Sequence, residues 1–280
     1  MSATPEPHVP FPQIDPIAFQ IGAFAVRWYA LAYLFGILLG GVYGHMLLRR
    51  RDLWNDGKPP FEAPAIWDFG LWAVIGIVVG GRLGYVLFYD LTYYLANPVG
   101  IIAMTDGGMS FHGGIVGLML AVAVFTRAKG GSILSAFDLL SAVAPIGVFL
   151  GRIANFINGE LYGAPTTLPW GTVFPTDPAQ VPRHPSQLYE ALLEGLLLFI
   201  VLRIATHQFF ALRRPGIIAG IAAIGYAVSR IAVEFVRVPD PQIGYLYGGW
   251  LTMGMVLTLG ILALGIFFVA LGARKKSPAA

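Results

Sequence analysis

Three arginines lie within otherwise apolar segments of the chain. They are Arg82 in GGRLGY, Arg152 in GRIANF and Arg230 in AVSRIAV. A guanidinium group binds phosphate oxygens in pairs, so arginine is well suited to recognising a phosphate. Near the middle of a membrane-spanning helix an arginine costs about 2.5–3.5 kcal/mol on insertion scales, which makes each of these residues a candidate for function. The first chemistry indicated is the binding of an anionic group.

Further polar residues accompany Arg230 at helical spacing. Tyr226, Arg230, Glu234 and Arg237 are separated by four, four and three residues, so one helix presents them on one face. Arg230 and Glu234 are therefore expected to form an ion pair within that helix.

A second dense group of polar residues follows Arg152. In the stretch GRIANFINGELYG the amides of Asn155 and Asn158 and the carboxylate of Glu160 come where a helix is broken by glycine. Gly159 and Gly163 are expected to let the chain turn tightly there. Packing alone does not account for so many polar groups in so apolar a chain.

Several kinds of chemistry are excluded. The chain has no cysteine, so it contains neither a catalytic thiol nor a disulfide nor a thiolate metal site. HExxH, GxSxG and Walker motifs are absent, and no histidine spacing predicts a metal site. Ser110 lies two residues from His112, but no third residue completes a triad. We therefore expect no metal and no cofactor, and any sulfur chemistry would come from the substrate.

The composition places these residues in a bilayer. Of 280 residues, 56% are hydrophobic and 12% are charged, and the mean hydropathy is +0.70, whereas about 25% of a soluble domain is charged. The net charge of +3 comes from short basic clusters between apolar runs, which indicates membrane orientation and not nucleic-acid binding. The first 20 residues lack a basic stretch followed by an apolar one, so no cleaved signal peptide is expected.

The predicted fold is an all-α integral membrane protein with about seven transmembrane helices in one unit, 1–280. Such a helix needs about 20 mainly apolar residues. Residues 159–185, rich in Pro, Thr and Gly, are expected to form a small extramembrane lobe with short strands between the fourth and fifth helices. Residues 92–104 are interpreted as an interfacial segment. The predicted helices are 27–48, 65–89, 111–126, 135–157, 186–206, 216–236 and 245–272.

The distribution of basic residues predicts the orientation. Lysine and arginine cluster after helices one, three, five and seven, so the N-terminus is expected outside, the C-terminus in the cytoplasm and the lobe on the periplasmic side. Arg82, Arg152 and Arg230 lie in the later halves of helices that run outward, which puts them in the outer half of the bilayer. Residues near the starts of inward-running helices reach the same level; they are Tyr29, His112, Glu190 and Glu194.

Each candidate also has a purely structural interpretation. Arg82 can be held by backbone carbonyls or by Asp90, and His112 can cap a helix or lie at the interface. Arg230 and Glu234 can form a buried structural pair. Other polar and small residues are interpreted as helix caps, interhelical hydrogen-bonding groups or packing positions; they are Asp68, Asp138, Gly113, Gly114 and Gly117. The convergence of many polar residues at one level favours a functional site.

At these residues the sequence resembles the prolipoprotein diacylglyceryl transferase family. The resemblance covers most of the chain and includes the seven-helix layout. Departures are mild: Ala154 stands where the family usually has glycine, Tyr162 where tryptophan is common, and Ile115-Val116 where Leu-Ile is familiar. The similar blocks are RWYALAY (27–33), GGRLGYVLFYD (80–90), FHGGIVG (111–117), GRIANFINGELYG (151–163), RHPSQLYEALLEG (183–195) and YAVSRIAVEFVRVPD (226–240).

The resemblance implies a reaction that the residues alone do not name. The family transfers the diacylglyceryl group of phosphatidylglycerol to the thiol of the lipobox cysteine in a preprolipoprotein, which forms a thioether and releases glycerol phosphate. The implied partners are that lipid, the lipobox-containing signal peptide and the bilayer, and the implied place is the bacterial inner membrane, with the site toward the outer leaflet. The thiol, whose ordinary pKa is about 8.5, must lose its proton, and the charge on the leaving phosphate must be stabilised.

Roles for the candidate residues follow from both arguments. Arg152 and Arg230 are expected to bind the phosphate and stabilise its leaving form. His112 is expected to act as the base for the thiol or as a hydrogen-bond donor to the head group. Tyr29, Asn155 and Tyr226 would orient lipid oxygens, and Glu160 and Glu234 would position the cations. The remaining candidates for substrate binding are Asn158, Gly163, Arg82 and Arg237.

Two other classes of function stay open at this point. A transporter or channel for an anionic solute would also need membrane-embedded arginines, but its site usually lies at the midplane between repeats, and this chain shows no internal repeat. A non-enzymatic lipid-binding scaffold would explain the arginines but leaves His112 and the amide cluster without a role.

Overall fold

The computed structural model describes residues 8–102, 107–238 and 244–274. Within them, five helices are long and apolar enough to cross a membrane. These are α1 (Trp28–Arg49), α2 (Ile66–Phe88, extended at its start by the turn Ala63–Ala65), α5 (Ile133–Ile157), α8 (Ile217–Glu234) and α9 (Met253–Arg274). The described part of the chain is thus that of a mostly helical, multi-pass membrane protein.

Two further predicted helices are present in shorter or interrupted form. Helix α4 (Phe111–Ala128) is apolar but shorter than most of the others. The segment predicted as 186–206 consists of α6 (Ser186–Glu190), a π-helical segment η5 (Ala191–Leu197) and α7 (Leu198–His207). Its two buried glutamates lower its hydropathy, and the π-helical segment divides it.

The predicted ends agree with the structure within two residues for six of the seven segments. The seventh is wrong at its start. Residues 245–252 contain a small hairpin of β6 (Tyr245–Tyr247) and β7 (Leu251–Thr252), and α9 begins only at Met253. The hairpin turns at Gly248 and Gly249, whose φ angles of 59° and 71° favour glycine.

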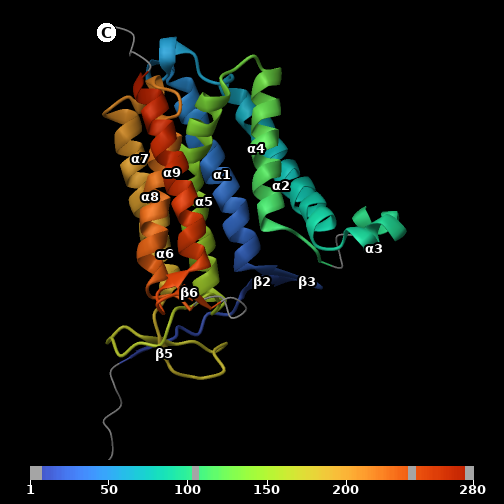
Figure 1. Cartoon of the computed structure of the whole chain (residues 1–280), viewed down its shortest axis with the longest axis vertical. Coiled ribbons are helices and arrows are strands. Elements are labelled where there is room, and N and C mark those ends of the chain that lie inside the picture. Colours follow the sequence, from blue (N-terminus) through green and yellow to red (C-terminus); the bar gives the residue numbers. More distant parts are fainter. Residues whose placement is uncertain (1–7, 103–106, 239–243, 275–280) are drawn as a thin grey trace, which may run out of the picture.

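The helices form two groups, which Figure 1 shows side by side. Helix α1 packs along α5, and α8 packs along α9, whereas α2 and α4 form a separate pair. Glycines bring α2 and α4 together: a Cβ atom on Gly117 would lie 2.0 Å from the carbonyl oxygen of Gly76, and one on Gly80 would lie 2.4 Å from that of Gly113. The interpretation of Gly113 and Gly117 as packing residues is confirmed.

Short strands surround the end of the helices that lies away from the C-terminus (Figure 1). The predicted lobe contains β4 (Thr172–Val173) and β5 (Pro182–Arg183), and β1 (Val9–Pro10) joins them in the order β1-β4-β5. A second hairpin, β2 (Ile17–Ile21) with β3 (Phe24–Arg27), leads into α1. The predicted interfacial segment contains α3 (Leu91–Ala96) and the turn Pro98–Ile102, and its residues 103–104 lie outside the described part.

The apolar core lies toward the opposite end of the helices. Trp54, Phe125, Leu139 and Leu212 are buried there in one cluster. This cluster lies at the end near the C-terminus, whereas the polar side chains that form the site lie at the end near the lobe.

Asp138 is a buried carboxylate within this core, and it caps α8 from α5. Its two oxygens accept hydrogen bonds from the backbone N–H groups of Gly216 (2.7 Å) and Ala219 (2.8 Å). The interhelical interpretation of Asp138 is confirmed, and its negative charge suits a helix N-terminus.

We expect Asp138→Ala to destabilise the protein by about 1–3 kcal/mol, because two buried donors lose their acceptor. Thermal unfolding in detergent measures this. Asp68 is exposed in the first turn of α2, so Asp68→Ala is a matched control that should change stability by less than about 0.5 kcal/mol. Equal effects of the two substitutions would contradict the capping role.

Candidate functional site

Glu190 is the centre of a network of ion pairs near the lobe. Its carboxylate is fully buried and lies 3.2 Å from Nε of Arg152, 3.0 Å from Nη1 of Arg230 and 2.7 Å from Nη1 of Arg237. The three arginines come from α5, from α8 and from the residues just after α8. One carboxylate thus gathers three cations from two helices.

Glu234 holds two of the same arginines from the other side. It lies 2.9 Å from Arg230 and 3.8 Å from Arg237, and it accepts a hydrogen bond from the hydroxyl of Thr252 at 2.8 Å. The ion pair expected between Arg230 and Glu234 is confirmed. The helical face predicted from their spacing therefore exists and points into the protein.

Glu194 completes the network: within the described part of the chain it forms one ion pair, 3.3 Å from Nη2 of Arg152. The carboxylates are the more deeply buried partners throughout. The glutamate side chains are 0–7% exposed and the arginine side chains are 17–22% exposed. The guanidinium groups therefore reach the surface of the protein while the carboxylates hold them from behind, an arrangement that can present positive charge to an anion.

Local structure of the segment 186–207 positions the two glutamates. Glu190 ends α6 and Glu194 lies in the π-helical segment η5; single-turn π segments inside helices are frequent at functional sites. Gly195 lets this segment approach α5, because a Cβ atom there would lie 2.6 Å from Cβ of Phe149. The close approach brings Glu190 and Glu194 within reach of Arg152.

A second polar group, one turn along α5, contains three predicted site residues. Asn155 is buried and donates hydrogen bonds to the hydroxyl of Tyr29 and, at 2.9 Å, to Glu160. The amide of Gln187 donates to the backbone carbonyl of Glu160, which ties this group to α6 and thus to Glu190. The structure brings Tyr29, Asn155 and Glu160 together beside the ion network.

The glycine-rich turn after α5 has the predicted geometry at Gly159, but the prediction of a tight turn at Gly163 is wrong, because the backbone there pairs with Arg237 in an isolated β-bridge. Gly159 has a φ of 66°, and Asn158 before it carries a buried side-chain oxygen without a hydrogen-bond partner in the described residues. At Gly163 a Cβ atom would lie 2.3 Å from the carbonyl oxygen of Val236 and 2.8 Å from Cβ of His184. Gly163 is thus the point where the lobe touches the end of α8.

Tyr226 lies one turn before Arg230 on α8. It is partly buried and within electrostatic range of Arg152, Arg230 and Glu194. Its phenol therefore belongs to the surroundings of the network, as the helical spacing predicts.

His112 lies apart from the ion network in this structure. It is exposed in the first turn of α4, and α4 packs mainly against α2. Within the described residues, none of the hydrogen bonds or ion pairs of Arg152, Arg230 and Arg237 involves it.

Arg82 is buried and holds backbone carbonyls. Its guanidinium donates to the carbonyls of Gly100 (2.6 Å), Ile101 (2.8 Å), Gly107 (2.6 Å) and Gly108 (3.0 Å). This is one of the two structural arrangements that the sequence leaves open. Arg82 thereby ties the loop between α2 and α4 to α2.

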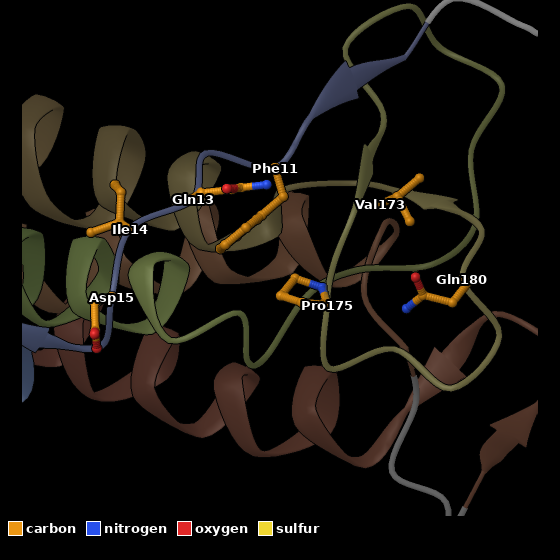
Figure 2. Close-up of a pocket in the computed structure, with 7 residues that line it drawn as sticks. All are labelled: Phe11, Gln13, Ile14, Asp15, Val173, Pro175 and Gln180. Atoms are coloured by element: carbon orange, nitrogen blue, oxygen red, sulfur yellow. The ribbon is translucent and has the colours of Figure 1, made fainter.

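A shallow hollow of about 490 Å³ lies elsewhere, between the N-terminal segment and the lobe. Figure 2 shows its lining residues, with Phe11 and Ile14 on one side and Pro175 and Gln180 on the other. Its acidic residue, Asp15, accepts a hydrogen bond from the backbone of Ile17. None of the predicted site residues lines this hollow, so the ion network is the candidate site.

The sequence predicts Glu190 and Glu194 at the same level as the arginines but indicates no role for them; the structure brings both into contact with Arg152. Two glutamates four residues apart in an apolar segment were the available signal, since a buried carboxylate needs a cation. What the pattern did not supply was the partner, because Arg152, Arg230 and Arg237 are 38 to 47 residues away in the chain.

In the lobe, an ion pair makes stability depend on pH. Arg183 donates to both oxygens of buried Asp177, at 2.6 and 2.9 Å, and the guanidinium holds the pKa of Asp177 below its usual value. Burial also lowers the pKa of His184, whose neutral form is favoured in the folded lobe.

We expect the lobe to loosen in acid. A carboxylate with a lowered folded pKa contributes stability above its unfolded pKa of about 3.9, and this contribution is lost as the pH falls through the folded value. His184 adds a loss that begins below its unfolded pKa of about 6.5. Hydrogen exchange of residues 164–183, corrected for intrinsic rates, measures the effect. The variant Asp177→Asn should lose the steep part below about pH 4, and an unchanged profile would contradict the assignment.

Fold and site together define a class: a multi-pass helical membrane protein with three buried carboxylates that present three arginines near a small lobe. A family model described as prolipoprotein diacylglyceryl transferase matches residues 16–271. A phosphatidylglycerol–prolipoprotein diacylglyceryl transferase of Rhizobium meliloti (strain 1021) is 54% identical over 272 residues, or 97% of this chain and 96% of the relative. One of the same name from Brucella canis is 53% identical over 257 residues, 92% and 91% of the two chains. The chain belongs to the prolipoprotein diacylglyceryl transferase family.

Proposed function

We propose that this chain transfers the diacylglyceryl group of phosphatidylglycerol to the thiol of the lipobox cysteine of a preprolipoprotein, with release of glycerol phosphate. The names of its relatives support the two substrates. The observation that carries the proposal is the Glu190 network, because three guanidinium groups that reach the surface suit the phosphate of an anionic lipid.

The proposed topology has seven spans in one polytopic unit, 1–280. They are α1, α2, α4, α5, the segment α6–α7, α8 and α9, with the N-terminus outside and the C-terminus in the cytoplasm of the bacterial inner membrane. The distribution of lysine and arginine supports this orientation. The lobe, 159–185, then lies on the periplasmic side, and the ion network lies toward the outer leaflet, where lipid enters sideways.

The proposed chemistry is a displacement at carbon. Sulfur of the lipobox cysteine attacks the glyceryl carbon that bears the phosphate ester, the C–O bond breaks, and the electron pair stays on the phosphate oxygen. The phosphate group thereby changes from a monoanion to a dianion. Arg152 and Arg230 bind the phosphate and stabilise the added negative charge. Such stabilisation of a developing charge by fixed groups is usually the largest single contribution to catalysis.

The other residues are proposed to orient the lipid. Tyr29, Asn155 and Tyr226 contact its oxygens, and Glu160 and Glu234 hold the groups that bind it. Asn158, Gly163 and Arg237 line the same region, and Arg82 acts by holding the backbone carbonyls of Gly100, Ile101, Gly107 and Gly108. His112 completes the site from α4 in one of its two roles, as base for the thiol or as donor to the head group.

The experiment uses purified protein with phosphatidylglycerol labelled in its terminal glycerol and a lipobox peptide. Release of glycerol phosphate that requires the cysteine, and is absent with a serine peptide, supports the transferase. Lipid binding without release by folded protein would support a scaffold. Movement of an anionic solute across vesicles, with no release, would support a transporter.

A further inference from the structure

Glu194 is a buried carboxylate for which the proposed chemistry has no role so far. We propose that Glu194 is the group that accepts the proton of the lipobox thiol. This inference rests on the proposed function and names the proton acceptor of the same reaction.

The three glutamates of the network differ in how firmly they are held. Glu190 has three arginine partners, and Glu234 has two arginines and a hydroxyl. Glu194 has one ion pair, through Oε2 to Arg152, and its buried Oε1 has no hydrogen-bond partner within the described residues. Of the three carboxylates, Glu194 therefore loses the fewest ion pairs and hydrogen bonds when it is protonated. Its Oε1 has a free lone pair that can accept the proton.

The charge balance of the site favours transfer of the thiol proton to Glu194. Among the described residues, three arginines face three glutamates, so the charges of these six side chains balance before the lipid binds. The phosphate adds one negative charge on binding and a second when it leaves as a monoester. In a site with a low effective dielectric an uncompensated charge is costly. A proton that moves from sulfur to Glu194 removes one negative charge as the phosphate gains one.

Arg152 links the two events. It contacts Glu190 through Nε and Glu194 through Nη2, and its side chain is 22% exposed. When this guanidinium also binds the phosphate, the phosphate competes with Glu194 for its positive charge, which favours protonation of Glu194. Charged or titratable groups close to Glu194 are contributed by α5, α6 and α8; they are Arg152, Glu190, Arg230 and Tyr226.

The complete step is balanced. The S–H proton passes to Oε1 of Glu194, the sulfur electron pair forms the S–C bond, and the C–O bond of the phosphate ester breaks with its electrons on oxygen. Afterwards the site holds a neutral Glu194 and a glycerol phosphate dianion on the arginines. His112 then keeps the second of its roles, donation to the head group.

The test uses a substrate whose nucleophile does not need a base. A lipobox peptide with selenocysteine in place of cysteine carries a selenol, which is already ionised at neutral pH and needs no base. We expect Glu194→Gln to lower turnover of the cysteine peptide by about 10²–10⁴-fold, the usual contribution of a general base. With the selenocysteine peptide, the variant should come within about tenfold of the wild type. Glu194→Asp should keep part of the activity toward cysteine.

Glu190→Gln is the matched control, since it perturbs the arginines and should be slow with both peptides. Rescue of His112→Gln by selenocysteine, with no rescue of Glu194→Gln, would overturn the proposal and make His112 the acceptor. Full activity of Glu194→Gln toward cysteine would also overturn it. Absence of thiol-dependent release by the wild type is a different result, because it rejects the proposed function and this inference together.

Discussion

Replacing Arg152 with alanine is expected to lower the release of glycerol phosphate by about 10²–10³-fold, the effect of removing one fixed group that stabilises a developing oxyanion. Arg152 is the cation that contacts both Glu190 and Glu194, and its side chain is partly exposed, so it can meet a phosphate without leaving its carboxylates. A steady-state assay with labelled phosphatidylglycerol and a lipobox peptide measures the loss.

Arg152→Lys separates charge from geometry. Lysine keeps the positive charge but cannot contact two carboxylates and a phosphate through a planar fork, so we expect most of the activity to be lost here as well. Arg127, which is exposed in the last turn of α4, provides the control. Arg127→Ala should leave turnover within about twofold, as expected for a surface substitution. Near-normal turnover of Arg152→Ala would reject its role in holding the phosphate.

The level at which the polar residues meet could be predicted from the sequence, because helix direction alternates in a bilayer. That rule predicts Arg152, Arg230 and Glu190 at one level, and in the structure each of the two arginines lies within 3.2 Å of the Glu190 carboxylate. Helical spacing also predicted the pair of Arg230 and Glu234. The position of a residue along a membrane-spanning helix, and the face of the helix on which it lies, depend on nearby sequence only. Both can therefore be predicted from a single sequence.

Contacts between distant segments could not be predicted in the same way. The pairing of β1 with β4 joins residues far apart in the chain, and each strand has two residues. The hairpin of β6 and β7 reads as part of an apolar run until its two glycines turn the chain. For Arg82 the sequence offers two kinds of partner, and only the fold shows that the guanidinium binds backbone carbonyls, those of Gly100, Ile101, Gly107 and Gly108.

Glu190→Gln is the second substitution with a large expected effect. Among the residues that the structure describes, its carboxylate is the one group that contacts Arg152, Arg230 and Arg237 together, so its loss leaves three nearby cations with less compensating charge. Removing one partner of a buried ion pair costs about 3–5 kcal/mol. We therefore expect a large fall in the unfolding temperature in detergent. Turnover should be lost as well, because no common carboxylate then holds the three guanidinium groups next to one another.

A double variant tells whether charge imbalance is the cause. Arg237→Gln added to Glu190→Gln removes one of the uncompensated cations, so the double variant should be more stable than Glu190→Gln alone, with a coupling of about 1–3 kcal/mol between the two sites. Glu62→Gln is the matched control, because Glu62 pairs with Arg51 at 2.9 Å on the surface and such pairs contribute about 0–1 kcal/mol. Strictly additive effects of the two substitutions would mean that Glu190 stabilises the fold by packing, and that the cations hold their places without it.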